Sequence, residues 1–474
     1  MVSPARRLAP ARPAPPPRPR AEWGRRALLA APLLAIGFAI AAFGGVYAWA
    51  YGLAYALVFL TLAAAAVQAA RGRLRLRWRS PYLPLLLFGA LLLLQLQLPL
   101  SVDPAATLTA LLHLGAAAAV FILVSQAYRP RDAGWITLSF SLFTAALALL
   151  AILQILTASH GIYWRFTYAY ASPAGSFVNR NHFAGCMEML LPLACVAAYR
   201  RRERPWQDFL PWAAPPALGV AAMVLAASRG GLAALALQAL AALLLGLYLR
   251  RRQIAGARLA AASAWLPLPA RLAAPPRRPR PALPRRRLPG RLASLLIVVA
   301  LTVGMVELVG TARLQARLGT ANLQSPDFAQ RLLLDQSTLA MFRERPLFGW
   351  GLGTWADVYP LFARFNSTAV YAFAHNDYLQ LLAETGLAGA ACVLLFWTLW
   401  GGEWARALRR WPPPAADPAA AALPLAAALG CLGLLVHSLV DFNLHIPANL
   451  LLFFVLAALA LPSRPGGEGS IPLS

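Results

Sequence analysis

The chain has 474 residues, of which 59% are hydrophobic and 13% charged, and its formal net charge is +26. A chain this long and this apolar is excluded from the class of single water-soluble domains. All 43 basic residues are arginine and fall in short blocks between apolar runs, with no nucleic-acid-binding motif beside them, so no nucleic acid is expected as a partner.

The apolar runs are continuous and long enough to cross a bilayer as helices, whereas barrel strands would alternate between apolar and polar residues. The sequence therefore predicts an all-α polytopic membrane protein with about twelve transmembrane helices. We place these spans at residues 27–44, 46–70, 81–98, 105–127, 134–157, 181–199, 209–228, 230–249, 293–310, 379–400, 419–437 and 447–461.

The remaining segments divide the chain into regions of different composition. We predict a disordered Arg/Pro-rich cytoplasmic tail at 1–26, spans one to nine within 27–310, an Arg/Pro-rich cytoplasmic loop at about 250–292, a large outer loop carrying helices at 311–378, spans ten to twelve within 379–461, and a cytoplasmic tail at 462–474. The loop at 250–292 is expected to lie against anionic membrane lipids.

The arginine distribution predicts the orientation of these spans. With the N-terminus inside, 34 of the 43 arginines fall in inside segments, as the positive-inside rule requires. Both termini are then cytoplasmic, and the loop 311–378 faces outward.

Within that outer loop, Ser325, Pro326 and Asp327 form a helix-start signal, and the helix is expected to run to about Arg345. A glycine-rich turn follows at 346–353. No strand precedes those glycines, so they give only a weak signal for dinucleotide binding.

Polar residues that suit chemistry collect on the outer side of the predicted topology. They are Asn179, Arg180, His182, Arg229, Arg331, His375, Asn376, Asp377, His437, Asp441 and His445. Polar residues away from the membrane core are where function tends to lie.

Two of these residues carry the most specific expectations. Arg229 sits between two apolar runs beside Gly230 and Gly231, where charge is costly, so a functional role is favoured over simple snorkelling to the interface. His375 is either a helix cap or a general base. With Asn376 and Asp377 beside it we favour the base, since imidazole suits proton transfer near neutral pH.

His437, Asp441 and His445 have i, i+4, i+8 spacing, which matches a metal site if a single helix carries all three. Pro447 and a turn-like Asp-Phe-Asn oppose a continuous helix. A hydrogen-bonded network or a wall of the substrate site is therefore favoured over a metal, and no metal or other cofactor is expected.

One sequence pattern resembles the periplasmic motif of bacterial O-antigen ligases: His375-Asn376, followed after nine residues by Gly386-x-x-Gly389. Three further features are similar to the O-antigen ligase and polymerase superfamily: Ser228-Arg229-Gly230-Gly231, Arg331, and twelve spans with one large loop between helices 9 and 10. The resemblance implies a GT-C-like architecture. The resemblance covers roughly residues 170–455.

The resemblance implies a glycosyltransferase of the bacterial inner membrane with its site at the periplasmic face. The donor would be an undecaprenyl-pyrophosphate-linked glycan, and the acceptor a sugar hydroxyl of lipid A-core or a similar glycan or glycolipid. His375 would deprotonate that hydroxyl, Arg229 and Arg331 would hold the pyrophosphate, and transfer would proceed with inversion and without metal.

Several alternatives stay open on the sequence, among them a scaffold or assembly subunit whose outer polar residues form a docking surface. An O-antigen or exopolysaccharide polymerase, which extends lipid-linked repeat units, would use the same site residues. A transporter or flippase for lipid-linked glycans belongs to another class, and would place polar residues at the bilayer midplane. The spans are nearly free of charge, which favours the enzyme.

Overall fold

The computed structural model describes residues 19–157, 161–168, 172–202, 204–263, 326–365, 370–409 and 417–462, with the short pieces 299–300, 303–304 and 307. Most of the predicted ninth span at 293–310 lies outside these residues. So do the first part of the predicted N-terminal tail, most of the loop predicted at 250–292, the start of the outer loop, and nearly all of the C-terminal tail.

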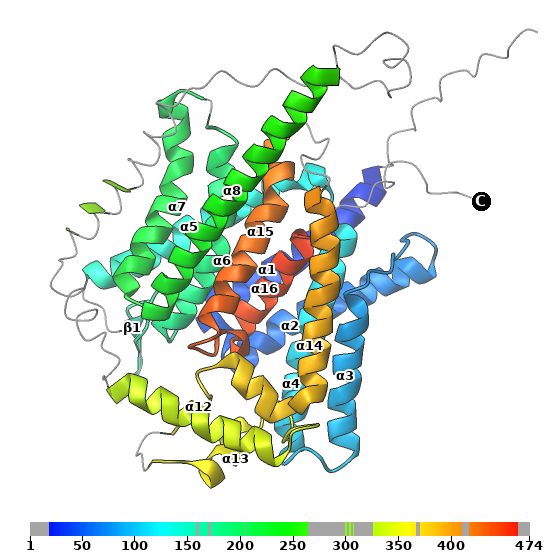
Figure 1. Cartoon of the computed structure of the whole chain (residues 1–474), viewed down its shortest axis with the longest axis vertical. Coiled ribbons are helices and arrows are strands. Elements are labelled where there is room, and N and C mark those ends of the chain that lie inside the picture. The colour runs from blue at the N-terminus through cyan, green and yellow to red at the C-terminus, as the bar shows by residue number, and fades with distance from the viewer. Residues whose placement is uncertain are drawn as a thin grey trace, which may run out of the picture.

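The described residues form a bundle of helices with one small hairpin (Figure 1). Its first half contains α1 Pro19–Ala41, η1 Phe43–Gly45, α2 Ala48–Ala70, α3 Tyr82–Gln97, α4 Pro104–Ala127, η2 Pro130–Asp132, α5 Ala133–Leu156, β1 Gly161–Ile162 and β2 Phe166–Thr167. The second half contains α6 Arg180–Tyr199, α7 Trp206–Ala226, α8 Arg229–Ser263, α12 Pro326–Glu344, α13 Trp355–Val358, η3 Tyr359–Phe362, α14 Asp377–Arg409, α15 Pro418–His437, η4 Asn443–His445 and α16 Pro447–Leu459.

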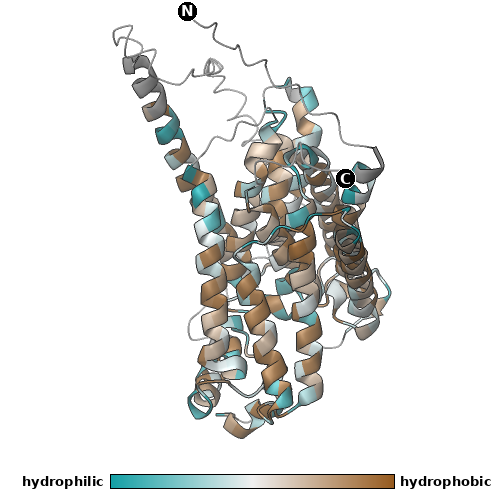
Figure 2. Cartoon of the chain, turned by 90° about the vertical axis from the view of Figure 1, so that its right-hand side faces the viewer, coloured by the Kyte–Doolittle hydropathy of each residue, from teal (hydrophilic) through white to brown (hydrophobic). Residues whose placement is uncertain are grey.

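The described helices confirm a multi-pass membrane protein. Nine of them are long and apolar enough to cross a bilayer, and α3 and α16 are shorter apolar helices that coincide with two more predicted spans. Most of the hydrophilic residues lie near the helix ends, while the middle lengths are mostly apolar (Figure 2). The nine long helices are α1, α2, α4, α5, α6, α7, α8, α14 and α15.

Helix α6 lies at the centre of the bundle. Of the residues in its most apolar stretch, 83% are buried, against 11% for α8, which faces outward. Helix α6 packs against α5, α7, α8, α15 and α16. A helix that is buried against neighbours on every side is fixed by them, so the residues at the start of α6 are held rigidly.

Two helices extend further than the sequence predicts, and each is held by an arginine. Helix α1 begins at Pro19, inside the predicted tail, because Arg25 bridges its first turns to the Asp132 carboxylate at 2.6 Å. Helix α8 continues to Ser263, past the predicted end of its span. There Arg252 donates to the Leu408 and Arg409 carbonyl oxygens, each at 3.0 Å, where the end of α14 attracts cations.

Helices α12 and α13 lie across one end of the bundle (Figure 1). Helix α12 ends at Glu344, which agrees with the predicted end at about Arg345, and the predicted cap Ser325 lies outside the described residues. A separate small core of Leu334, Met341, Trp350, Trp355, Val358, Tyr359, Ala374 and Ala383 joins these elements to the start of α14. The extramembrane part therefore has its own packing and is attached to the bundle through α14.

Helix α14 is broken at Gly386, whose φ of 60° and ψ of −160° are not helical. The two parts of the helix point in different directions (Figure 1). The glycine-rich turn fills the break: Trp350 N–H donates to the Ala383 carbonyl at 3.1 Å, and Leu387 N–H donates to the Pro346 carbonyl at 2.8 Å. The turn therefore has a structural role and supplies the hydrogen bonds that the helix loses at the break.

The backbones approach so closely at this break that only glycine fits. Gly349 has a φ of 69°, and a Cβ atom there would overlap the backbone of Glu384. A Cβ atom at Gly386 would overlap the backbone of Leu347, and one at Gly389 would overlap the Thr385 side chain. The Gly386-x-x-Gly389 part of the motif is thus explained by packing.

We expect Gly349→Ala and Gly386→Ala each to lower the Tm of the detergent-solubilised protein. A left-handed alanine alone costs about 1 to 2 kcal/mol, and the overlaps add to it. Gly401→Ala in the same helix is the control, since no atom lies within 4 Å of a Cβ there. Its Tm should stay equal or rise, and equal Tm values for all three variants would contradict the assignment.

Candidate active site

The connection between α15 and α16, residues 438–446, forms the centre of the site. Helix α15 ends at His437, and Pro447 starts α16, so the chain turns sharply between them. Asn443 in this turn is buried and accepts from Asn449 Nδ2 at 3.2 Å. Gly185 of α6 leaves room for it, because a Cβ atom there would overlap the Asn443 side chain. The turn is therefore packed into the bundle.

Asp441 is wholly buried in this turn. Its carboxylate accepts from Asn181 Nδ2 at 2.5 Å and from the Phe442 N–H at 2.8 Å. Two imidazoles approach the same oxygen, with His182 Nε2 at 3.7 Å and His375 Nδ1 at 3.8 Å. Burial alone favours the neutral acid, but these two histidines hold the pKa of Asp441 well below its usual range.

His375 lies just before α14 in a strained backbone conformation. Its φ is 56°, in the left-handed region that non-glycine residues rarely adopt. Its side chain is 25% exposed, and its ring packs edge-on against Phe442 at 4.8 Å between centroids. Phe442 also contacts the His182 ring at 4.6 Å between centroids, so this aromatic side chain packs against both imidazoles. Such strain is found where the surrounding structure fixes a residue for function.

Asp377 does not orient His375, although the two are close in sequence. Its Oδ1 lies 2.7 Å from His445 Nδ1, and its Oδ2 accepts from the Leu444 N–H at 3.1 Å. Burial lowers the pKa of His445, but the Asp377 carboxylate outweighs burial and raises it. Asn376, not Asp377, caps α14, because its Oδ1 accepts from the Leu379 N–H at 3.2 Å.

A second buried acid and histidine lie deeper in the bundle. His437 Nδ1 is 2.9 Å from Glu188 Oε1, and both side chains are almost fully buried. Gly230 faces the ring of His437, and a Cβ atom there would come within 2.8 Å of it. The sequence prediction left Glu188 out of the site, because a lone acid within an apolar run does not reveal its partner.

Arg331 of α12 reaches the central turn, where its Nη1 donates to the Val440 carbonyl. On the same helix Asp335 is paired with Asn376. Burial raises the pKa of Asp335, while Asn376, Arg331 and His375 oppose the shift. Helix α12 therefore lies over the site and brings one predicted arginine to it.

Arg229 is the first residue of α8, is exposed, and directly precedes Gly230. Arg180 is half-buried and begins α6, where Asn179 caps the helix by accepting from the Asn181 N–H at 2.9 Å. The residues predicted from sequence thus gather at one end of the bundle.

His437, Asp441 and His445 do not converge. Each pairs with a different partner, because α15 ends at His437 and the helical spacing does not continue. Among the described residues, no group of three or more histidine, cysteine, aspartate or glutamate side chains is arranged to hold a metal ion.

We expect His445→Gln to remove one pH-dependent contribution to stability. His445 lies outside the spans and its pKa is raised, so its pairing with Asp377 stabilises the fold fully below histidine's ordinary pKa of about 6.5. That stability is lost as pH rises through the higher folded-state pKa.

The Tm values of the wild type, His445→Gln and Asp377→Asn, measured between about pH 5 and 8, check this. The difference in Tm between the wild type and His445→Gln should shrink as pH rises, and the difference between the wild type and Asp377→Asn should shrink in the same way. A difference in Tm that grows with pH would contradict the assignment.

Comparison with known proteins places this site in a family. Residues 216–394 match the family model described as O-antigen ligase. The match includes Arg229, Arg331 and His375, whereas Asp441 and His445 lie beyond it. No curated protein matches the chain significantly. The chain therefore carries an O-antigen ligase domain over residues 216–394, and this domain is typical of membrane glycosyltransferases of lipopolysaccharide biosynthesis.

Proposed function

We propose that this protein transfers a glycan from undecaprenyl pyrophosphate to a sugar hydroxyl of a glycolipid acceptor such as lipid A-core. The observation that carries the proposal is the contact of His375 Nδ1 with the buried Asp441 carboxylate at 3.8 Å. A carboxylate this close to one ring nitrogen favours the protonated imidazole and leaves the other nitrogen for proton transfer.

In the proposed step, His375 Nε2 accepts the proton of the acceptor hydroxyl. The acceptor oxygen then forms a bond to the anomeric carbon of the donor sugar. The bond from that carbon to the pyrophosphate oxygen breaks, and the pyrophosphate leaves with the electron pair. The configuration at the carbon inverts, and no covalent enzyme intermediate is required.

Charge on the leaving pyrophosphate needs stabilisation by cations, and arginine binds phosphate oxygens in a forked geometry. We assign this task to Arg229 and Arg331. Arg331 already reaches the turn that holds Asp441, and Arg229 begins the helix whose Gly230 packs on His437. Arg180, Asn179 and His182 would line the adjoining part of the substrate site.

Asp441 acts as a positioning residue in this scheme. Its low pKa keeps it ionised, so it stabilises the imidazolium that forms when His375 takes the proton. The arginine distribution supports a periplasmic location for this end of the bundle, with the arginine-rich tail and loops on the cytoplasmic side of the inner membrane.

We expect His375→Ala to abolish transfer in proteoliposomes while donor binding stays within about twofold of wild type. Asp441→Asn should reduce kcat by about 10² to 10⁴, a typical range for losing general acid–base catalysis. Product is followed by gel mobility with purified donor and acceptor. Undiminished turnover by the His375 variant would exclude it as the base.

Arg229→Lys retains the positive charge but loses the forked donor geometry. We expect it to weaken donor binding by about tenfold, the loss of roughly 1.4 kcal/mol of a charge-assisted contact. Titration with labelled donor measures this. Arg343→Lys, on an exposed part of α12, is the matched control and should bind as the wild type does. Full affinity in Arg229→Lys would exclude the clamp.

The product formed by the purified protein identifies the acceptor. A glycan attached to lipid A-core is expected. A lengthened lipid-linked glycan would instead indicate a polymerase, and movement of donor across the membrane without product would indicate a transporter.

A further inference from the structure

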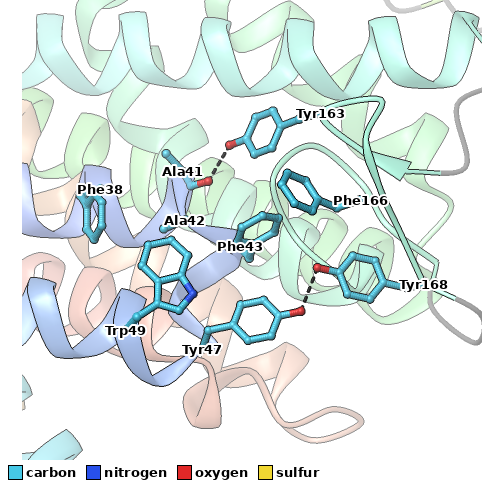
Figure 3. A pocket seen from close by; sticks show the side chains of 9 residues that line it. All are labelled: Phe38, Ala41, Ala42, Phe43, Tyr47, Trp49, Tyr163, Phe166 and Tyr168. Carbon is cyan, nitrogen blue, oxygen red and sulfur yellow. Dashed lines mark hydrogen bonds between the residues drawn. The ribbon is translucent and has the colours of Figure 1, made fainter.

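An aromatic groove lies beside the site, between the α1–α2 turn and the β1–β2 hairpin. It has a volume of about 640 Å³, and Phe43, Tyr47, Trp49, Tyr163, Phe166 and Tyr168 line it (Figure 3). Phe43 is at its centre, with ring centroids 5.1 Å from Phe166 and 5.5 Å from Tyr47. None of these residues belongs to the catalytic arrangement proposed above.

The backbone around this groove is strained in the same way as at His375. Among the described non-glycine residues, five have positive φ. Phe43, Tyr163 and Trp164 lie in or beside the groove, and His375 is another. Strain of this kind costs free energy and persists where a structure holds a functional surface in place.

The lining is chemically suited to a hydrocarbon chain. The three tyrosine hydroxyls already have partners: Tyr47 and Tyr168 bond each other at 2.9 Å, and Tyr163 donates to the Ala41 carbonyl at 2.6 Å (Figure 3). The lining therefore offers a sugar few protein hydrogen-bond partners for its hydroxyls and presents mostly aromatic carbon. An apolar chain needs no such partners, and Trp49 at 53% exposed offers it a wide surface.

A cation stands next to this apolar surface. The Arg165 guanidinium lies 5.7 Å from the centre of the Phe166 ring, and Arg165 is exposed at the tip of the hairpin. An apolar groove with one arginine at its rim matches a lipid chain attached to a phosphate-bearing head group.

The position of the groove selects the acceptor lipid over the donor lipid. In the segment 437–447, Gly230 faces His437 and Arg331 bonds to Val440, so the first part of the segment lies on the side where the pyrophosphate is proposed to bind. The end of the segment abuts the α1–α2 turn, where a Cβ atom at Gly45 would lie 3.3 Å from Pro447 Cβ. Asp441, with His375 beside it, lies between these two contacts in sequence. Displacement with inversion needs the acceptor oxygen opposite the leaving group, so the acceptor belongs on the groove side.

We propose that this groove binds the lipid chain of the acceptor glycolipid, with Arg165 meeting a phosphate of its head group. This rests on the proposed function for the identity of the ligand as an acceptor. The binding of a lipid with an anionic head group can be measured without any glycan transfer.

The binding experiment uses full-length His375→Ala protein in nanodiscs, which is expected to be inactive. Phosphatidylglycerol with a photoactivatable acyl chain is the probe, and mass spectrometry locates the label. We expect labelled peptides covering 38–49 and 161–168. Ala42→Trp, which fills the groove, should reduce that labelling at least fivefold. Ala70→Trp, exposed at the other end of α2, is the matched control and should not.

Arg165→Gln should remove the preference of these peptides for phosphatidylglycerol over phosphatidylcholine. Labelling that Ala42→Trp leaves unchanged would mean ordinary contact of surface aromatics with the membrane interface, and would overturn the proposal.

The activity experiment separates acceptor from donor. Lipopolysaccharide lacking O-antigen and its delipidated core oligosaccharide present the same sugars with and without the lipid. In protein with native His375, Ala42→Trp should raise KM for the lipid-bearing acceptor about tenfold. The KM for the donor and the rate with the delipidated core should stay within twofold of the wild-type values.

A raised donor KM would instead assign the groove to the donor chain and contradict the proposal. If no variant or wild-type protein makes product, the proposed function fails, while the labelling result still decides whether the groove binds an anionic lipid.

Discussion

The site depends on the requirement that a buried carboxylate be fully partnered. Asp441 is removed from water and is held by an amide, a backbone N–H and two imidazoles. Those partners come from three separate parts of the chain: the start of α6, the turn after α15, and the residues just before α14. Because an unpartnered buried charge is strongly destabilising, this single group fixes the relative positions of all three.

Four acid–imidazole contacts lie in this region: those of Asp441 with His182 and His375, and two further pairs. The Glu188–His437 pair lies within the helices and ties α6 to α15. The Asp377–His445 pair holds the start of α14 against the turn. Only the Asp441–His375 contact involves an imidazole in a strained, partly exposed position, which is why we assign the base there.

Much of the fold could be predicted from sequence, because apolar length and arginine position directly reflect the bilayer. The helix predicted to run to about Arg345 is present as α12, which ends at Glu344. Partners distant in sequence could not be predicted. Asp377 appeared to be the natural neighbour of His375, yet it contacts His445, because the side chains at the start of a helix point in different directions. Likewise, the break at Gly386 depends on a backbone angle that residue type permits but does not specify.

The docking of the glycine-rich turn into α14 has a consequence for how such enzymes diversify. Main-chain hydrogen bonds between Ala383–Ala388 and Pro346–Gly351 dock the turn at the break in α14, so this docking depends little on the identity of the side chains in the turn. Leu347 and Phe348, which are exposed, are free to vary as long as the glycines remain. The exposed surface of this turn can then change by evolution or engineering while the two parts of α14 keep their arrangement.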